Sequence, residues 1–499
     1  MKKLFIMASV AVIMSGGYSA TLNGGSGGRR LGDSNIRGFV SPARQNKPPL
    51  SGREEKNPEH PNDLRFVGVR QKTIGGIVYS YHGYTLDRIG DVWIDAAKRP
   101  FVLAIDKAEF DSTVEDVNIP DRIDGMPVVE VGVKCFQNCS RIKRVILPKK
   151  ILTINSDAFS GCRALESVTG LEQCRVIGDD AFRDCNKLKT KIVFEKDVRV
   201  CARAFKGCHE IVSAEFRGRI SAGSIRDLKD WMDEELFADC RKLSHFKFPV
   251  GVKTIGSGAF ASCSSLTDVV IPDSVEEVRI PGSEVRGAFQ DCTSLRSVTI
   301  PSSVRHVGNR AFKGCVSLKK VVLPFSIMEI SGGMFDGCSS LESVKIPNNV
   351  TKIGSPNAFK DCIALTKISI PKNVTEIGVG AFEGCSLLNI TLPPKVEKIL
   401  PSAFKGCVAM EELKLPNVTE IGTHAFDGCV GLKAIEIPKV KTIGALAFKG
   451  CKSLRGISIP DGCTCWDVCF DGCDALETVD MPTGASFGRA FKNCSNVTS

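Results

Sequence analysis

Apolar and polar residues follow one pattern along most of the chain, and residues 364–385 show it clearly, reading ALTKISIPKNVTEIGVGAFEGC. In the first part of this copy apolar and polar residues alternate, which is typical of a short strand with one buried face. Pro371 should end that strand, because proline has no N–H to donate to a ladder. A second short extended segment and a turn at Gly378 then close one coil. The apolar positions are Leu365, Ile368, Ile370, Val374, Ile377, Ala381 and Phe382.

A Phe followed three positions later by a Cys marks sixteen such copies, from Phe136 to Phe491. Successive phenylalanines are 21 to 32 residues apart, the extremes being Phe470 to Phe491 and Phe205 to Phe237. This period predicts a stacked solenoid, because a single unit cannot bury its apolar face alone. Equivalent strands should pair about 4.8 Å apart in parallel sheets, and the phenylalanines should stack into an aromatic spine.

The copies at 265–275 (SLTDVVIPDSV) and 364–385 closely resemble the bacterial leucine-rich repeats of the BspA-like family, whose units read roughly LxxVxIPxxVxxIGxxAFxGC. The resemblance covers residues 118–499 and includes a family-like lead-in, IPDRIDGMPVVEVG, at 119–132. It implies a β-rich leucine-rich-repeat coil and an exported or surface-exposed protein that adheres to host proteins, matrix or other cells. A resemblance of this kind identifies the scaffold and leaves the partner open.

The amino-terminal segment has the layout of a secretory signal peptide. Lys2 and Lys3 precede an apolar run at residues 4–14, which is too short to span a bilayer, and small residues follow up to Ala20. We therefore expect residues 1–20 to direct export, and the protein to be secreted, on the cell surface or in the periplasm. No later apolar run is long enough to predict a membrane span. Residues 21–62, rich in Gly, Pro, Asn, Arg and Ser, predict a flexible leader.

Residues 63–117 hold Tyr79, Tyr81, Tyr84 and Trp93. The alternation in IVYSYHGY predicts a strand or hairpin. Because an open solenoid end must be covered, we expect this segment to be an amino-terminal cap on a solenoid of residues 118–499. The alternative is an aromatic patch that binds a partner and includes Tyr79 and Tyr81.

Two steps of the repeat are longer than the rest, near residues 210–236 and 279–286. Loops inserted into repeat proteins often carry binding, so Asp230, Trp231 and Glu234 are candidate contact residues. The alternative is an amphipathic helix that only packs on the coil. Its apolar face would comprise Ile225, Leu228, Trp231, Met232 and Leu236, with Asp230, Asp233, Glu234 and Glu235 mostly opposite. The second insertion adds the segment from Pro281 to Glu284.

Of the 22 cysteines, sixteen occupy the repeat slot. Most of the others replace small apolar residues, as expected for thiols that are reduced and buried. The six cysteines outside the repeat slot occupy four kinds of position: the Val slot (Cys174 and Cys463), the Ala slot (Cys135 and Cys469), the turn Gly slot (Cys201) and a solvent-facing position (Cys465). Disulfides between neighbouring coils remain an alternative in an exported protein. The cysteines of 463–473 are only weakly zinc-like, so no metal is expected.

Composition and motifs point away from catalysis and from nucleic acid. The net charge of +10 is spread over 499 residues with acids interleaved, which gives no evidence for a nucleic-acid partner. The six histidines are scattered, and neither a metalloprotease motif nor a phosphate-binding loop is present. We expect no enzymatic activity and no cofactor.

The solvent-facing strand positions form a row that is small and polar, positive or neutral in its middle and acidic toward its end. It contains Val270, Thr299, Val322, Lys345, Ser369, Thr391, Lys414, Glu436, Ser458 and Asp480. Without an aromatic stacking platform the row suits broad protein contact better than sugar or base binding. Lys345, Ser369, Lys414 and Glu436 are therefore candidate contact residues, and a plain solvated sheet is the alternative.

Together these observations predict an exported leucine-rich-repeat protein that binds proteins or cell surfaces, in adhesion. Two other functions stay open: a self-associating structural component of an envelope or extracellular matrix, and an inhibitor or scaffold for exported enzymes.

Overall fold

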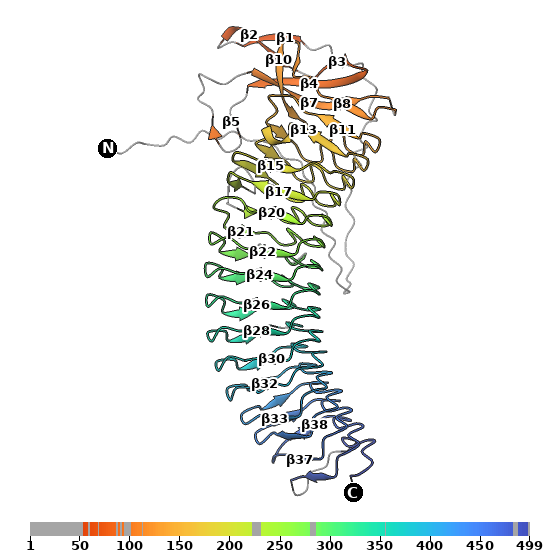
Figure 1. Ribbon diagram of the computed structural model, residues 1–499, viewed down its shortest axis with the longest axis vertical. Helices are drawn as coiled ribbons and strands as arrows, with labels where there is room; N and C mark the ends of the chain where they lie inside the picture. The colour runs from red at the N-terminus through yellow and green to blue at the C-terminus, as the bar shows by residue number, and fades with distance from the viewer. Residues whose placement is uncertain are drawn as a thin grey trace, which may run out of the picture. The chain divides into compact units, whose positions relative to one another are not determined.

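The computed structural model describes residues 53–57, 60–67, 69–85, 88–89, 92–93, 101–111, 113–221, 231–279, 286–354, 356–482 and 488–497. Within residues 51–499 the chain winds as a stack of coils with short strands, as the ribbon in Figure 1 shows. Most coils contribute a strand to a front sheet and a strand to a second sheet, and each has a turn that holds the repeat Phe, here called the Phe turn. The predicted parallel solenoid is confirmed. The expected signal peptide at 1–20 lies outside the described residues.

The front sheet is built from parallel strands of successive coils, and its pairing is interrupted three times. Its strands are β8 (Asp116–Asn118), β11 (Arg144–Ile146) and β13 (Ser167–Thr169); β15 (Ile192–Phe194), β17 (Ser213–Phe216) and β20 (His245–Lys247); β22 (Asp268–Val270), β24 (Ser297–Thr299), β26 (Lys320–Val322), β28 (Ser343–Lys345) and β30 (Lys367–Ile368); and β33 (Glu412–Lys414), β35 (Ala434–Glu436), β37 (Gly456–Ser458) and β39 (Thr478–Asp480). The central residue of most strands points inward, as the burial of Val298 between two exposed neighbours shows.

The second sheet runs beside the front sheet with strands of two or three residues. Its strands are β12 (Thr153–Ile154), β14 (Val176–Ile177), β16 (Val198–Val200) and β18 (Ile220–Ser221); β19 (Trp231–Met232), β21 (Thr254–Ile255), β23 (Glu277–Val278) and β25 (His306–Val307); and β27 (Glu329–Ile330), β29 (Lys352–Ile353), β31 (Glu376–Ile377), β32 (Lys398–Ile399), β34 (Glu420–Ile421), β36 (Thr442–Ile443) and β38 (Thr464–Cys465). One short 3-10 helix, η2 (Leu171–Gln173), interrupts the β structure.

At the amino-terminal end further strands, some paired in parallel and some antiparallel, extend the second sheet. The strands are β3 (Arg70–Ile74), β4 (Ile77–Thr85), β7 (Phe101–Glu109) and β10 (Met126–Val131), with β9 (Arg122–Ile123) beside β10, and separate pairs β1 (Arg53–Asn57) with β2 (His60–Val67) and β5 (Arg88–Ile89) with β6 (Val92–Trp93). The predicted strand or hairpin at IVYSYHGY is confirmed by the β3–β4 pairing. The flexible leader is wrong over Arg53–Asn57, because this polar segment pairs with the strand that follows it.

The repeat phenylalanines form the predicted spine. From Phe136 to Phe491 neighbouring ring centroids lie 5.1 to 6.2 Å apart and their planes differ by at most 16°. Backbone bonds hold the same turns together; for example, the N–H of Phe359 donates to the carbonyl of Ala381 at 2.8 Å. Stacked aromatic contacts add to the burial of their area, so the spine joins each coil to the next.

The repeat cysteines form a second ladder. In fifteen of the sixteen copies the Sγ donates to the carbonyl oxygen of the Phe one coil earlier, at 3.0 to 3.3 Å, as Cys338 does to Phe312. All 22 cysteines lie within the described ranges and are free thiols, most of them buried. This agrees with the reduced, buried reading of the sequence. The solvent-facing assignment of Cys465 is wrong: it pairs with Ile443 in β38 and so takes the inward Ile slot.

The helix expected in the first insertion is wrong over Trp231–Leu236. Trp231 and Met232 form β19, which pairs in parallel with β21, and Leu236 is buried in the slot before Phe237. These residues take the second-strand and Phe-turn slots of an ordinary coil, so the register of the stack overrides their helical spacing. Ile225, Leu228 and Asp230, with the insertion from Pro281 to Glu284, lie outside the described residues.

The Phe turn requires a left-handed backbone two residues after the Phe. Gly384 occupies that position with φ of 75°, and Asp361 occupies it one coil earlier with φ of 56°. A Cβ on Gly384 would collide with Oδ1 of Asp361, whereas a Cβ on Gly450, with φ of 65°, would have no atom within 4 Å. At the position two residues after the Phe, an acidic residue in one coil therefore favours glycine in the next coil.

These two glycines give a matched test of that rule. Gly450→Ala should cost about 1 kcal/mol of unfolding free energy, the penalty of a left-handed alanine. Gly384→Ala should cost more, because Asp361 must also move, and adding Asp361→Gly should recover the difference. Urea unfolding measures the unfolding free energy of each variant. Equal losses for the two single variants would contradict the rule.

Burial of the thiols predicts a loss of stability in alkali. It raises the pKa of Cys292, Cys385 and Cys429 to about 12, while a thiol of the unfolded chain ionises near pH 8.5. The folded state then keeps protons that the unfolded state releases, so stability is complete below about pH 8.5 and falls as pH rises toward 12. The urea midpoint should drop between pH 8 and 10, and less steeply in a variant with these three cysteines replaced by alanine. Equal slopes for both proteins would refute this origin.

Candidate functional site: the exposed face of the front sheet

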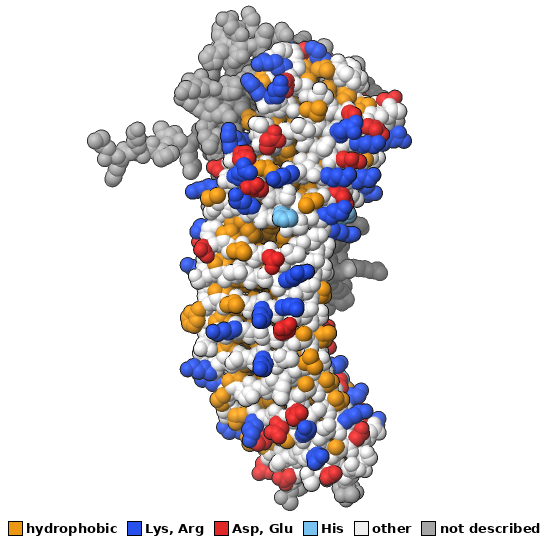
Figure 2. Space-filling model, in the orientation of Figure 1, with side chains coloured by type: hydrophobic (Ala, Val, Ile, Leu, Met, Phe, Trp, Pro, Cys, Tyr) orange, Lys and Arg blue, Asp and Glu red, His pale blue; other side chains and the backbone are white. Residues whose placement is uncertain are grey.

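The exposed face of the front sheet carries the row predicted from the sequence. Val270, Thr299, Val322 and Lys345 stand opposite one another across β22, β24, β26 and β28. Every position of the row is exposed, and Figure 2 shows this face as an open surface. The register of short strands therefore brings side chains that are 22 or more residues apart in the sequence into one line.

The charged side chains of this face differ between its middle and its carboxyl-terminal part. On β33–β39 two ion pairs form: Lys414 lies 2.7 Å from Glu436, and Lys433 lies 3.1 Å from Glu411. The hydrogen bond to Glu436 raises the pKa of Lys414. On β24–β30 five exposed cations make no ion pair with any described residue, namely Arg296, Lys319, Lys320, Lys345 and Lys367. The middle of the face therefore offers positive charge to a partner, whereas at the end two lysines are neutralised by glutamates of the same face.

The other candidate residues lie elsewhere, so the structure does not bring the predicted set together. Trp231 is half-buried in the second sheet, and the carbonyl of Glu234 accepts the N–H of Arg203 at 2.9 Å. Tyr79 and Tyr81 are buried, at 0% and 2% exposure, so the aromatic patch is wrong for them. The hydroxyl of Tyr79 donates to the carbonyl of Asn118, and that of Tyr81 donates to Asp124 at 2.6 Å.

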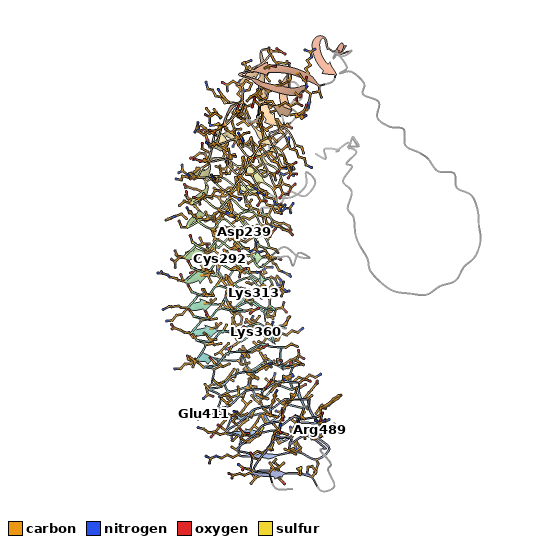
Figure 3. The ribbon with its side chains drawn as sticks, turned by 90° about the vertical axis from the view of Figure 1, so that its right-hand side faces the viewer. Asp239, Cys292, Lys313, Lys360, Glu411 and Arg489 are labelled. Atoms are coloured by element: carbon orange, nitrogen blue, oxygen red, sulfur yellow. The ribbon has the colours of Figure 1, made fainter. Side chains whose placement is uncertain are left out.

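A third face, over the Phe turns, carries ion pairs between successive coils. Arg203 lies 2.8 Å from Asp180, Lys206 lies 2.6 Å from the buried Glu235, and Lys313 lies 2.7 Å from Asp336. The hydrogen bonds to Asp180 raise the pKa of Arg203. Figure 3 shows Asp239, Lys313 and Lys360 following one another along the stack. Sequence reasoning missed this ladder, although the alternation of basic and acidic residues after the repeat Phe was its signal. Its charges neutralise one another, so the ladder joins coils.

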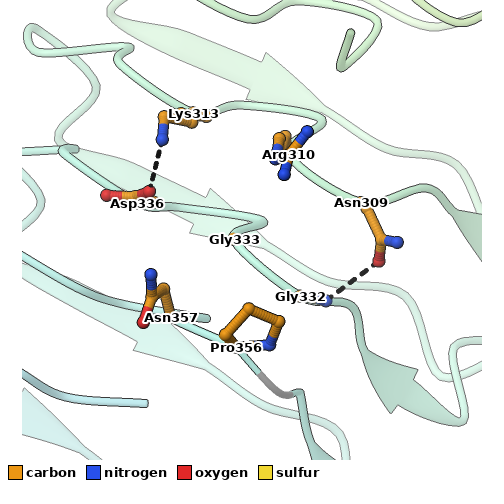
Figure 4. A pocket seen from close by; sticks show the side chains of 8 residues that line it. All are labelled: Asn309, Arg310, Lys313, Gly332, Gly333, Asp336, Pro356 and Asn357. Carbon is orange, nitrogen blue, oxygen red and sulfur yellow. Dashed lines mark hydrogen bonds and ion pairs between the residues drawn. The ribbon is translucent and has the colours of Figure 1, made fainter. Parts of the chain in front are cut away.

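A polar pocket of about 170 Å³ opens on that third face (Figure 4). Arg310 and Lys313 line it, and the glycines at 332 and 333 leave it open. Because Lys313 is paired with Asp336, only the exposed Arg310 lacks a described ion-pair partner there. This pocket can offer hydrogen bonds to one small anion.

Groups suited to chemistry are sparse in the described part of the chain. No cluster of three or more His, Cys, Asp or Glu side chains there could hold a metal ion. His82 lies 2.8 Å from Asp106 and His424 lies 2.9 Å from Asp427, both partly exposed. The hydrogen bond to Asp106 raises the pKa of His82, which favours the charged form of this pair at the amino-terminal strands.

The sequence model described as "BspA type Leucine rich repeat region (6 copies)" matches residues 104–227, 220–280, 285–411 and 399–499. The chain belongs to the BspA-type leucine-rich-repeat family. The match begins inside the segment expected as the cap, where the ring of Phe110 stacks 6.2 Å from Phe136.

Comparison with a solved structure shows the same fold. A leucine-rich repeat protein from Bacteroides ovatus is 24% identical, with 83% of this chain and 100% of that one covered and a TM-score of 0.65. A leucine rich cell surface protein from Faecalibacterium prausnitzii is 21% identical, with 85% and 98% covered and a TM-score of 0.45. No curated protein matches the chain. The described residues include no helix that is long and apolar enough to cross a membrane.

Proposed function

We propose that this protein is exported and binds other macromolecules through the exposed face of the front sheet, in adhesion to host proteins, matrix or cells. The observation that carries the proposal is the row of exposed side chains in register, with uncompensated cations over β24–β30. Unpaired exposed charges add little to folding stability, but they steer and orient a partner of opposite charge. The candidate contacts are Lys345 and Ser369, followed along the row by Lys414 and Glu436.

Different parts of the chain would have different roles. Residues 1–20 would direct export, and residues 63–117 would close the amino-terminal end of the stack through the β4–β7 and β7–β10 pairings. The solenoid itself would act by binding and not by catalysis. Membership of a leucine-rich-repeat family supports this reading, since the fold presents large surfaces to protein partners.

The test compares two charge reversals that change the net charge equally. Residues 21–499 should bind saturably to at least one member of a panel of matrix proteins, plasma proteins and whole cells. Lys320→Glu with Lys345→Glu should weaken that binding about tenfold or more, because both positions lie on the proposed face. Lys449→Glu with Lys492→Glu, on exposed unpaired residues of the Phe turns, should leave it within about twofold.

Surface plasmon resonance measures the affinity of each variant, and circular dichroism checks that each variant is folded. Equal weakening by the two pairs would remove the front sheet from the proposal. No binding by the wild type, together with oligomers that grow with concentration, would instead identify a self-associating structural protein.

A further inference from the structure

The front sheet opens between two successive coils. In the described chain β20 is the last strand of one stretch of sheet and β22 is the first of the next, so their facing edges share no ladder. A hollow of about 200 Å³ lies between them, lined by Phe246, Phe248, Phe260 and Phe289 from the core side and by Val270 and Asp268 of β22. Figure 2 shows a hollowed patch of hydrophobic side chains at the level that β20 and β22 occupy in Figure 1.

Oversized side chains in one coil account for this opening. Phe246 stands in the inward slot of β20 that valine occupies in strands such as β24, and its ring centroid lies 4.6 Å from that of Phe260. Beside Phe246 the distance between neighbouring rings of the spine is largest, with 6.2 Å between the ring centroids of Phe237 and Phe260. The extra ring separates the coils, and Phe246 and Phe248 stay half-buried where most other inward residues of the sheet are covered.

The hollow is large enough for one bulky apolar side chain. An apolar cavity of about 150 Å³ accepts benzene, so about 200 Å³ holds a phenyl ring or a branched aliphatic group. Val270 stands at the mouth with 70% of its surface exposed. Filling the hollow would bury these apolar surfaces and is therefore favourable.

Next to the hollow the face is positively charged. On β22–β30 and the two residues before each strand, the exposed charges are Arg296, Lys319, Lys320, Lys345 and Lys367 against Asp268 and Glu342. The carboxylate of Asp268 already accepts the hydroxyl of Ser297 at 2.6 Å. From β22 to β30 the strands span about 19 Å at about 4.8 Å each, the length of about six residues of extended chain.

We propose that this face binds an acidic, extended polypeptide segment, whose bulky apolar side chain fills the hollow between β20 and β22. Its carboxylates then lie over the cations of β24–β30, within a stretch of about six residues of the segment. This inference rests on the proposed binding role of the front sheet and gives that role a partner chemistry. A polypeptide fits best because it combines an apolar anchor with carboxylates and can also offer backbone groups to the open strand edges. A sulfated glycan or a nucleic acid supplies the negative charge without the apolar anchor.

Three fluorescein-labelled ten-residue peptides test this with the mature chain, residues 21–499. The first carries Asp and Glu residues around one central Phe, the second has Ser in place of that Phe, and the third keeps the Phe but has Lys in place of the acids. Fluorescence anisotropy should show the first binding about tenfold or more tightly than either other peptide. Its affinity should fall with added salt, as expected for exposed charges.

Two valines of the same row provide a matched pair of variants. Val270 lines the hollow, whereas Val322, 67% exposed two strands away, does not. Val270→Glu should abolish the preference for the Phe peptide over the Ser peptide, while Val322→Glu should keep it, although both add the same charge. Because both positions are exposed, neither change should disturb folding, which circular dichroism checks.

Equal affinity of the wild type for the Phe and Ser peptides would overturn the inference, as would equal effects of the two valine variants. Tighter binding of heparin than of the acidic Phe peptide would assign the face to a glycan instead and also overturn it. If matrix binding depends on Lys320 and Lys345 but the peptides show no preference, the proposed function stands and this inference fails. If the peptide preference appears while no matrix protein or cell binds, the hollow stands and the adhesive function fails.

Discussion

The stacking of one Phe turn on the next is the constraint on which the rest of the structure depends. Each turn joins its neighbour through a ring contact, a backbone hydrogen bond and, one coil on, a thiol that donates to the Phe carbonyl, as Phe312, Phe335 and Cys338 show. These contacts fix the spacing of coils regardless of what stands outside. Residues on the exposed strand positions are therefore free to vary while their register is held, which is why chemistry can be placed along the front sheet without cost to the core.

The constraint also explains the apolar hollow between β20 and β22 of the front sheet. A spine of equal rings tolerates a small inward residue in each front strand, because the remaining space matches valine. Phe246 exceeds that space, and the coils separate at the front while the Phe turns of Phe237 and Phe260 remain stacked. A packed interior is not continuously deformable, so an oversized residue yields a local opening instead of being absorbed over many coils.

The repeat pattern was sufficient to predict the coil, the spine, the buried thiols and the alignment of the exposed row, because each follows from a slot that recurs in every copy. Reasoning failed where a residue's slot was misjudged. Trp231 to Leu236 have helical spacing but occupy strand and turn slots, and Cys465 is inward because it pairs in register with Ile443. The burial of Tyr79 and Tyr81 depends on partners distant in sequence, Asn118 and Asp124, that no local pattern reveals. The hollow could not be predicted from the sequence, because its presence depends on how far two coils separate.

Charge pairing distinguishes the surfaces that hold this protein together from the one that faces a partner. Over the Phe turns an acid of one coil meets a base of the next, and at β33–β39 lysines and glutamates do the same across the front sheet. On β24–β30 the cations make no ion pair among the described residues, although Glu342 stands beside Lys319 on the neighbouring strand. Arg296 and Lys319 occupy matching positions on neighbouring strands, and because like charges held side by side repel, this arrangement slightly opposes folding. A binding role for the middle of the sheet accounts for that arrangement, since a partner rich in carboxylates would relieve the repulsion on docking.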